Sequence, residues 1–97
     1  MFPDPAAMIG PESPPFLSGA SLFGDPGQAP LTGHYYCLPH GTLLPAFMDI
    51  VADGRDVYSH SIHPPTHHTM YPNCRVLAAQ FIAAYLALPW QYAGRKT

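Results

Sequence analysis

The chain has little charge, and this limits the partners that its sequence allows. Only 10% of its 97 residues are charged, with four Lys and Arg against six Asp and Glu and a formal net charge of −2. Nucleic-acid binding needs a basic surface that neutralises phosphates, so the composition argues against nucleic acid as a partner. Small independent domains normally have a more charged surface. We therefore expect some apolar surface that meets a partner protein, a second copy or a missing part of the domain.

Cysteines and long hydrophobic runs are also scarce. Cys37 and Cys74 are too few for a disulfide framework, and we expect two free, buried thiols rather than one bridge. The longest apolar run, residues 76–90, falls short of the ~20 residues that span a membrane. The first ten residues lack the basic and apolar regions of a secretory signal. We expect no membrane association and a cytoplasmic location.

Proline and glycine are abundant and divide the chain into short pieces. Thirteen prolines and eight glycines in 97 residues predict a loop-rich chain, and this length allows at most one domain. Proline removes a backbone donor and biases its predecessor away from helix. We therefore interpret residues 1–17 as an irregular lead-in, residues 18–92 as the domain and residues 93–97 as a tail.

The residue pattern predicts strands followed by one helix. Strand-forming residues bounded by Gly and Pro indicate strands over residues 34–38, 47–52 and 66–71, with a further candidate at 19–23 and a loop over 55–65. Apolar residues at helical spacing predict a helix over 74–88, capped by Asn73 and ended by Pro89. The fold class is α+β, with a small, mainly antiparallel sheet against which the C-terminal helix is buried.

Four of the six histidines lie between residues 60 and 68, but their spacing does not predict a metal site. Zinc needs ligands that converge at about 2 Å. Pro64 and Pro65 interrupt any helix that would align His60 and His63 with His67, and neighbouring strand residues point to opposite faces. We assign no metal site and expect His60 and His63 to face solvent; a histidine-based metal protein is the third hypothesis for the function.

The segment His67-His68-Thr69 is the main candidate for chemistry. An imidazole in a cleft can donate to a carbonyl, stack on a ring or transfer a proton, whereas a hydrogen-bonded core histidine is the simpler alternative. Ser21 can hydrogen-bond a ligand and Tyr35 can stack on a planar ring. A Ser-His-Asp hydrolase would require Ser21, His67 and Asp53 to converge, and no local pattern indicates that they do.

The order of short motifs resembles a toxin family. The series is Gly19-Ala20-Ser21-Leu22-Phe23, Tyr36-x-Leu38-Pro39-x-Gly41-Thr42-x-x-Pro45, Val51-x-Asp53-Gly54-x-Asp56, Thr66-His67-His68-Thr69-x-x-Pro72 and an apolar helix. It is similar to that of the Tse-type toxins, type VI secretion effectors with an ADP-ribosyltransferase-like fold, and their fungal relatives. The resemblance covers residues 18–90. His68 stands where the family has tyrosine.

The resemblance implies an ADP-ribosyltransferase-like toxin domain that uses NAD and meets a protein acceptor or an immunity protein in the cytoplasm of a target cell. We assign catalytic roles to His67, His68 and Asp53, and cofactor binding to Ser21, Tyr35 and Thr69. The family's first strand has no counterpart here, and no glutamate follows Glu12, so that Asp53 or Asp56 would replace the catalytic glutamate. These differences predict an N-terminally shortened, incomplete domain. The alternative function is a non-catalytic module that binds a protein partner.

Overall fold

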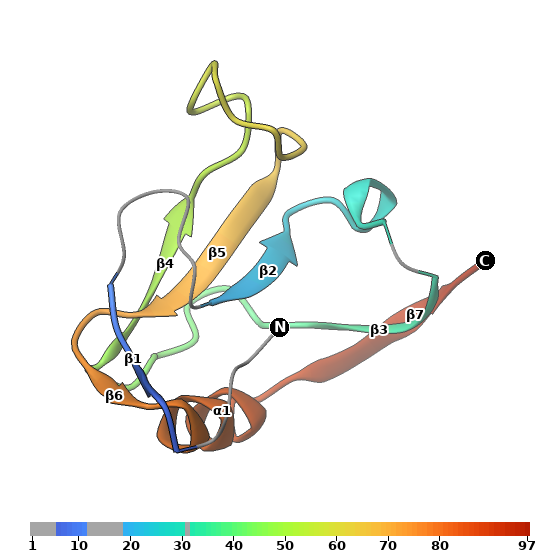
Figure 1. Ribbon diagram of the computed structural model, residues 1–97. Helices are drawn as coiled ribbons and strands as arrows, with labels where there is room; N and C mark the ends of the chain where they lie inside the picture. The colour runs from blue at the N-terminus through green and yellow to red at the C-terminus, as the bar shows by residue number, and fades with distance from the viewer. Residues whose placement is uncertain (1–5, 12–18, 31) are drawn as a thin grey trace.

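The computed structural model describes residues 6–11, 19–30 and 32–97, which form small antiparallel sheets and one α-helix that lies at one end of the largest sheet (Figure 1). The largest sheet has the order β2-β5-β4, with bounds Ala20–Phe23, His67–Pro72 and Met48–Ala52. Strand β3 (Gly33–Cys37) pairs with β7 (Gln91–Lys96), and β1 (Met8–Ile9) pairs with β6 (Val76–Leu77). A 3-10 turn, η1 (Pro26–Gln28), follows β2, and α1 spans Ala78–Leu86. The α+β prediction is confirmed, although the strands form separate sheets rather than one.

The predicted strands lie where the strand-forming residues are concentrated. Strands β3, β4 and β5 agree with the predictions to within one residue at each end, and the candidate at 19–23 forms β2. The segment between β4 and β5 is a series of turns, as predicted. Residues 93–96, which the sequence assigned to a tail, belong to β7 and pair with β3. Within the predicted lead-in, Met8–Ile9 form β1, and residues 1–5 and 12–17 lie outside the described part of the chain.

The helix begins later than its apolar spacing predicts. Residues Val76–Leu77 pair with β1, and the backbone N–H of Ala78 donates to the carbonyl of Ala7 at 2.9 Å. The prediction that Asn73 caps the helix is wrong. Its side-chain amide donates to the carboxylate of Asp49 and to the backbone carbonyl of Ala46, both at 2.9 Å. The helix ends before Pro89 as predicted.

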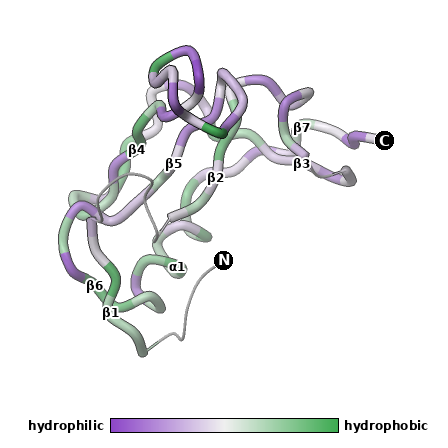
Figure 2. The backbone as a smooth tube through the Cα atoms, turned by 45° about the horizontal axis from the view of Figure 1, so that its top comes forward, coloured by the Kyte–Doolittle hydropathy of each residue, from purple (hydrophilic) through white to green (hydrophobic). Residues whose placement is uncertain are grey.

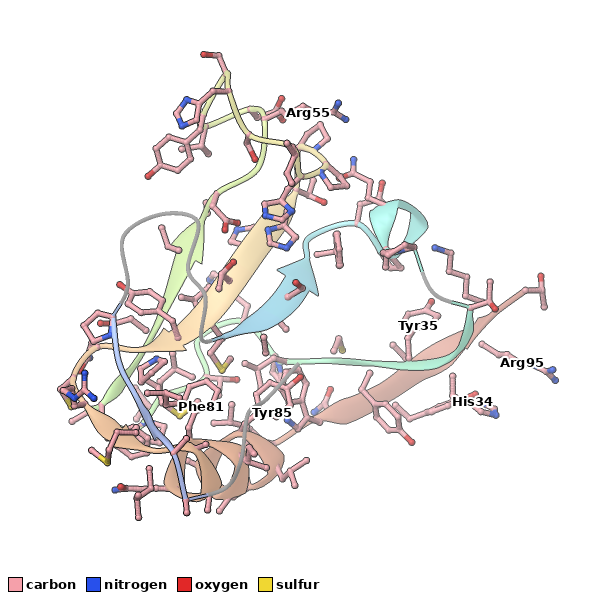
Figure 3. All side chains as sticks on the ribbon, in the orientation of Figure 1. His34, Tyr35, Arg55, Phe81, Tyr85 and Arg95 are labelled. Atoms are coloured by element: carbon pink, nitrogen blue, oxygen red, sulfur yellow. The ribbon has the colours of Figure 1, made fainter. Side chains whose placement is uncertain are left out.

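The hydrophobic core lies where α1 packs against the end of the largest sheet. Phe81 of α1 and Met70 of β5 are both fully buried, and Figure 3 shows Phe81 pointing from the helix toward the strands. The core is completed by Ile9, Met48, Val76, Ala78 and Leu88. In Figure 2 hydrophobic colour dominates α1 and β1, whereas hydrophilic stretches mark the loop between β4 and β5. The core thus fixes one end of the sheet and leaves the other end to polar residues.

The two cysteines lie at the surface of the protein. Cys37 and Cys74 are both free, but the prediction that they are buried is wrong, since both are exposed. Cys37 ends strand β3 and Cys74 lies in the turn before β6, so neither reaches the core. Among the described residues, none of the helices has the length and apolar character required to span a membrane.

We predict that Phe81→Ala lowers the free energy of unfolding by about 3–5 kcal/mol, because truncating a fully buried ring leaves a cavity. The matched control is Leu86→Ala on the same helix, whose side chain is 69% exposed. That control should change stability by less than about 0.5 kcal/mol. Urea unfolding followed by circular dichroism measures both. Equal destabilisation by the two variants would contradict this description of the core.

Candidate functional site

The alternation of side chains along β5 divides the predicted site residues between two faces of the sheet. His67 lies opposite Phe23 and Thr69 lies opposite Ser21 on β2, whereas His68 lies opposite Leu22. Directly opposed residues share a face, so His67 and Thr69 lie on one side and His68 on the other. His67 and Thr69 are buried, at 2% and 7% exposure. The expectation that the two histidines face opposite sides is confirmed.

The carboxylate of Asp53 binds both buried residues of the first face, His67 and Thr69. Asp53 follows β4 directly, and its backbone N–H donates to the carbonyl of His67 at 3.2 Å. Its Oδ1 accepts a hydrogen bond from His67 Nδ1 at 2.5 Å, and its Oδ2 accepts one from the hydroxyl of Thr69 at 2.6 Å. The predicted catalytic residues Asp53 and His67 are therefore in contact.

The same contacts set the protonation state of Asp53. Burial alone would raise the pKa of this carboxyl, since it disfavours the charged form. The hydrogen bonds from Thr69 and His67, and the attraction of the imidazoles of His67 and His63, outweigh burial. Together they hold the pKa below its ordinary value of 3.8. Asp53 is thus an ionised acceptor at neutral pH.

The loop between β4 and β5 places His63 against His67. The two imidazole rings are stacked, with centroids 3.9 Å apart and planes inclined by 10°. The hydroxyl of Ser61 donates to the carbonyl of Asp53 at 2.7 Å and accepts from the N–H of His63 at 3.1 Å. The expectation that His63 faces solvent is therefore wrong. The turn at Pro64-Pro65, which seemed to separate these histidines, folds one back over the other.

The close packing of this loop depends on a glycine. Gly54 is buried, and the carbonyls of Pro64 and Pro65 approach its Cα so closely that a Cβ would collide with them. The N–H of His67 also donates to the carbonyl of Pro64, at 3.0 Å. Asp53-Gly54 therefore does more than turn the chain after β4. It allows the two prolines to come near enough for His63 to reach His67.

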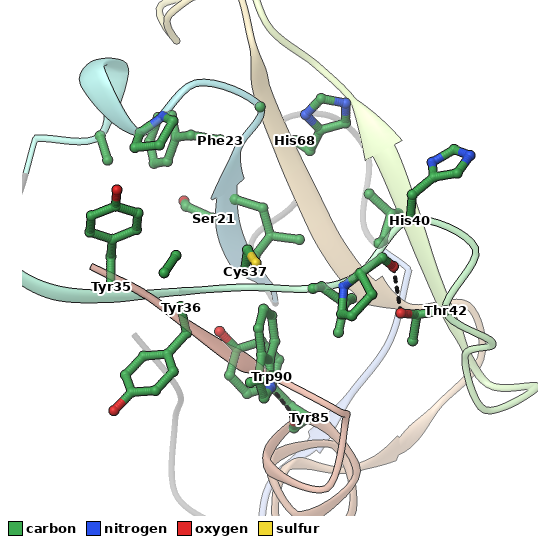
Figure 4. Close-up of a pocket in the computed structure, with 18 of the residues that line it drawn as sticks. Ser21, Phe23, Tyr35, Tyr36, Cys37, His40, Thr42, His68, Tyr85 and Trp90 are labelled. Carbon is green, nitrogen blue, oxygen red and sulfur yellow. Dashed lines mark hydrogen bonds between the residues drawn. The ribbon is translucent and has the colours of Figure 1, made fainter. Parts of the chain in front are cut away.

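An open groove of about 1290 Å³ borders the other face of β5 and the β3–β7 pair (Figure 4). Its lining includes Tyr35, His68 and Ser21. Ser21 shares the face of Thr69, but it lies on the edge strand β2, where the groove passes the edge of the sheet. Figure 4 shows Tyr35 pointing toward β2, whereas Tyr36 points to the opposite side of β3. The rings of Tyr85 and Trp90 close one end of the groove, 5.1 Å apart between centroids. We call this the aromatic groove.

Local contacts orient the polar groups of the aromatic groove. His68 Nδ1 donates to the carbonyl of Thr66 at 2.7 Å, which leaves Nε2 as its second polar atom. The indole N–H of Trp90 donates to the carbonyl of Tyr85 at 2.8 Å. Burial raises the pKa of the Tyr85 phenol, so this ring stays neutral. The groove therefore offers flat apolar surfaces with a few polar groups between them.

A second groove of about 640 Å³ lies beside His67. His67, His63, Phe23 and Ser21 line it, so that Ser21 borders both grooves. The ring of Phe23 meets His67 edge to face, with centroids 5.1 Å apart. We call this the histidine groove. The pairing of β2 with β5 places Ser21 on the same side of the sheet as the Asp53–His67 pair. The local sequence pattern did not indicate that these three residues lie on one side.

The six predicted site residues are therefore distributed over three environments. The aromatic groove contains Tyr35 and His68, the histidine groove contains His67, and Ser21 borders both. Asp53 and Thr69 line neither groove, because their side chains bind each other and His67. Chemically, Asp53 fixes the Nδ1 side of His67, and a neutral His67 then presents Nε2 as a base or ligand. The aromatic groove can hold a planar ring.

We predict that Asp53→Asn lowers stability at neutral pH and that this difference disappears in acid. A carboxyl whose pKa is lowered on folding contributes stability above its unfolded pKa, and loses it as the pH falls through the folded value. The difference in unfolding free energy between wild type and variant should therefore shrink as the pH falls below 3.8. Urea unfolding at a series of pH values measures it. A difference that stays constant in acid would contradict the network.

Comparison with known protein families, curated protein sequences and solved structures finds no match to this chain. The two kinds of chemistry that the structure offers are recognition of a planar ring in the aromatic groove and an oriented imidazole in the histidine groove.

Proposed function

We propose that the protein is a Tse-like toxin domain of the ADP-ribosyltransferase type, which binds NAD in the aromatic groove. The observation that supports this proposal best is that the groove gathers Ser21, Tyr35 and His68, which the sequence assigned to cofactor binding and catalysis. These residues come from β2, β3 and β5, so a ligand in the groove would touch separate segments of the fold. The family and its cofactor NAD come from the resemblance of the ordered sequence motifs to the Tse-type toxins.

The lining of the groove suits the planar parts of a dinucleotide. Rings in proteins prefer offset or edge-to-face contacts with other rings, and Tyr35, Tyr85 and Trp90 provide such surfaces. The Ser21 hydroxyl is exposed and can accept from or donate to a carboxamide. His68 Nε2 can bond a ribose hydroxyl. The groove volume of about 1290 Å³ exceeds the usual range of about 300–1,000 Å³ for ligand pockets, so a long ligand is accommodated.

The charge of the groove is modest for a ligand with a pyrophosphate. Lys96 is the basic side chain among the lining residues other than histidines, and its ammonium group donates to the carbonyls of Pro26 and Ala29. Figure 3 shows Arg95 pointing outward from the end of the β3–β7 pair. The proposal therefore places most of the binding free energy on ring contacts. It predicts only a weak dependence of affinity on salt.

NAD supplies an ADP-ribosyl group with nicotinamide as the leaving group, and the chain's residues have to hold both parts. Tyr35 and Trp90 provide the ring contacts, and Ser21 fixes the orientation of the bound ring by a hydrogen bond. His68 lies across the groove from the β3–β7 pair and faces the ribose. The acceptor is a protein that approaches through the open side of the groove. His67 and Asp53 act from the far side of β5 by positioning the strand that carries His68.

We expect NAD to shift the amide resonances of Ser21, Tyr35 and His68 in a ¹H–¹⁵N spectrum of the untagged chain. Ser21→Ala should weaken NAD binding about three- to tenfold, the effect of losing one hydrogen bond. Ser59→Ala, which changes an exposed serine in the loop between β4 and β5, is the matched control. Release of nicotinamide, measured by chromatography, reports turnover separately from binding.

The two readouts distinguish the parts of the proposal. Shifts confined to the groove residues, with release of nicotinamide, are the expected result. Dispersed resonances that do not respond to NAD would overturn the cofactor assignment. Binding without turnover would leave an NAD-binding domain and overturn the assigned enzymatic activity.

The second candidate is a non-catalytic module that binds a protein partner, such as an immunity protein or a second copy. Tyr36 and Tyr92 of the β3–β7 pair are 59% and 58% exposed, and their rings meet edge to face with centroids 5.6 Å apart. His34 Nδ1 lies 3.0 Å from the hydroxyl of Tyr92. Exposed tyrosines are enriched at interfaces, because they combine apolar area with a polar group.

If this aromatic surface pairs two copies, light scattering should give twice the monomer mass at high concentration. Tyr92→Ser should then shift the chain toward monomer, because it removes the ring from the surface. Tyr58→Ser, at a loop tyrosine that is 40% exposed, is the control and should leave the mass unchanged. A monomer at every concentration would contradict pairing through this surface.

A further inference from the structure

A cluster of possible metal ligands lies at the histidine groove, and none of its side chains lines the aromatic groove. Asp53, His63 and His67 can each offer a ligand atom, and these atoms lie within 4.8 Å of one another. Asp53 and His67 are at the polar end of the sheet, and His63 comes from the loop that covers it. The grouping is formed by the pairing of β4 with β5, which brings Asp53 next to His67 across the loop that joins the two strands.

The contact between Asp53 and His67 prepares one imidazole as a ligand. Its Nδ1 lies 2.5 Å from Oδ1 of Asp53, and the side chains of the pair are only 3% and 12% exposed. When Nδ1–H donates to the carboxylate, Nε2 of the neutral ring carries the lone pair. Metal-binding histidines almost always have their other nitrogen held by such a partner, which fixes the ring orientation and raises its basicity. Thr69 holds the second oxygen of the same carboxylate.

His63 supplies the second imidazole. Its ring lies parallel to that of His67, with centroids 3.9 Å apart. Parallel stacked rings direct their lone pairs along parallel planes, so joint binding of one ion requires His63 to turn about its side-chain bonds. His63 is only partly buried, and both rings border a groove of about 640 Å³ that gives room for this rotation.

We propose that the histidine groove binds one Zn²⁺ ion, through Nε2 of His67 and a ring nitrogen of His63, with Asp53 orienting His67. Imidazole nitrogens favour zinc and related transition metals, whereas magnesium and calcium favour oxygen ligands. Catalytic zinc sites have three protein ligands and one open position, so two protein nitrogens leave one more position for water or a substrate than those sites do. Ser21 and Gln28 line the same groove as the two histidines.

The test is zinc binding by the untagged full-length chain, dialysed against Zn²⁺ without NAD and analysed by elemental mass spectrometry. The wild type should retain one zinc ion per chain. His63→Ala should lose it, whereas His60→Ala, an exposed histidine of the same loop, should retain it. Asp53→Asn should weaken binding about 10- to 100-fold, the usual effect of removing a partner that orients a ligand.

Structural damage is separated from ligand loss by recording the amide spectrum of each variant. His63 is partly buried and outside the core, so His63→Ala should keep the dispersed spectrum of the wild type. Zn²⁺ should shift the ring resonances of His63 and His67 and leave those of His34 unchanged. The proposal is overturned if the wild type retains no stoichiometric zinc, or if the alanine variants at positions 60 and 63 retain equal amounts. Neither result depends on whether the aromatic groove binds NAD.

Discussion

The ionised carboxylate of Asp53 joins the segments on which both grooves depend. Asp53 follows β4, accepts hydrogen bonds from His67 and Thr69 of β5, and starts the loop that carries His63. A partly buried charge is tolerated only when hydrogen bonds replace its hydration, and here each oxygen has a donor. The core around Phe81 fixes the opposite end of the sheet. The polar end of the fold thus relies on one charged group rather than on apolar packing.

Strand β5 presents different side chains on its two faces, and only one of these faces contacts Asp53. Neighbouring residues of a strand point to opposite faces, so His67 lies with the carboxylate and His68 lies in the aromatic groove. Ser21 of β2 borders both grooves. A ligand in one groove therefore contacts the strands that position side chains in the other, which makes β2 and β5 the physical connection between the two proposed sites.

The sequence predicts those features that depend on neighbouring residues and misses those that depend on distant pairing. Strands and the end of the helix follow from strand-forming residues, Gly and Pro, which act locally. The late helix start follows from pairing of β6 with β1, which no local pattern contains. The alternation of side chains along a strand correctly predicts that His67 and His68 lie on opposite faces of β5. The same sequence does not predict the stack of His63 on His67, because Pro64-Pro65 indicates a break in the chain. The spacing His63-Pro-Pro-x-His67, interpreted as a tight return, is the signal that identifies it.

The most direct test of this account is a long-range ¹H–¹⁵N spectrum of the histidine rings, recorded at a pH where imidazoles are neutral. If Asp53 organises the polar end of the fold, His67 should be a single tautomer that is protonated at Nδ1. The Nδ1 proton should be shifted far downfield by its short bond to the carboxylate, and Asp53→Asn should move it. A His67 ring that averages between tautomers, like an exposed histidine, would contradict the central role of this pair.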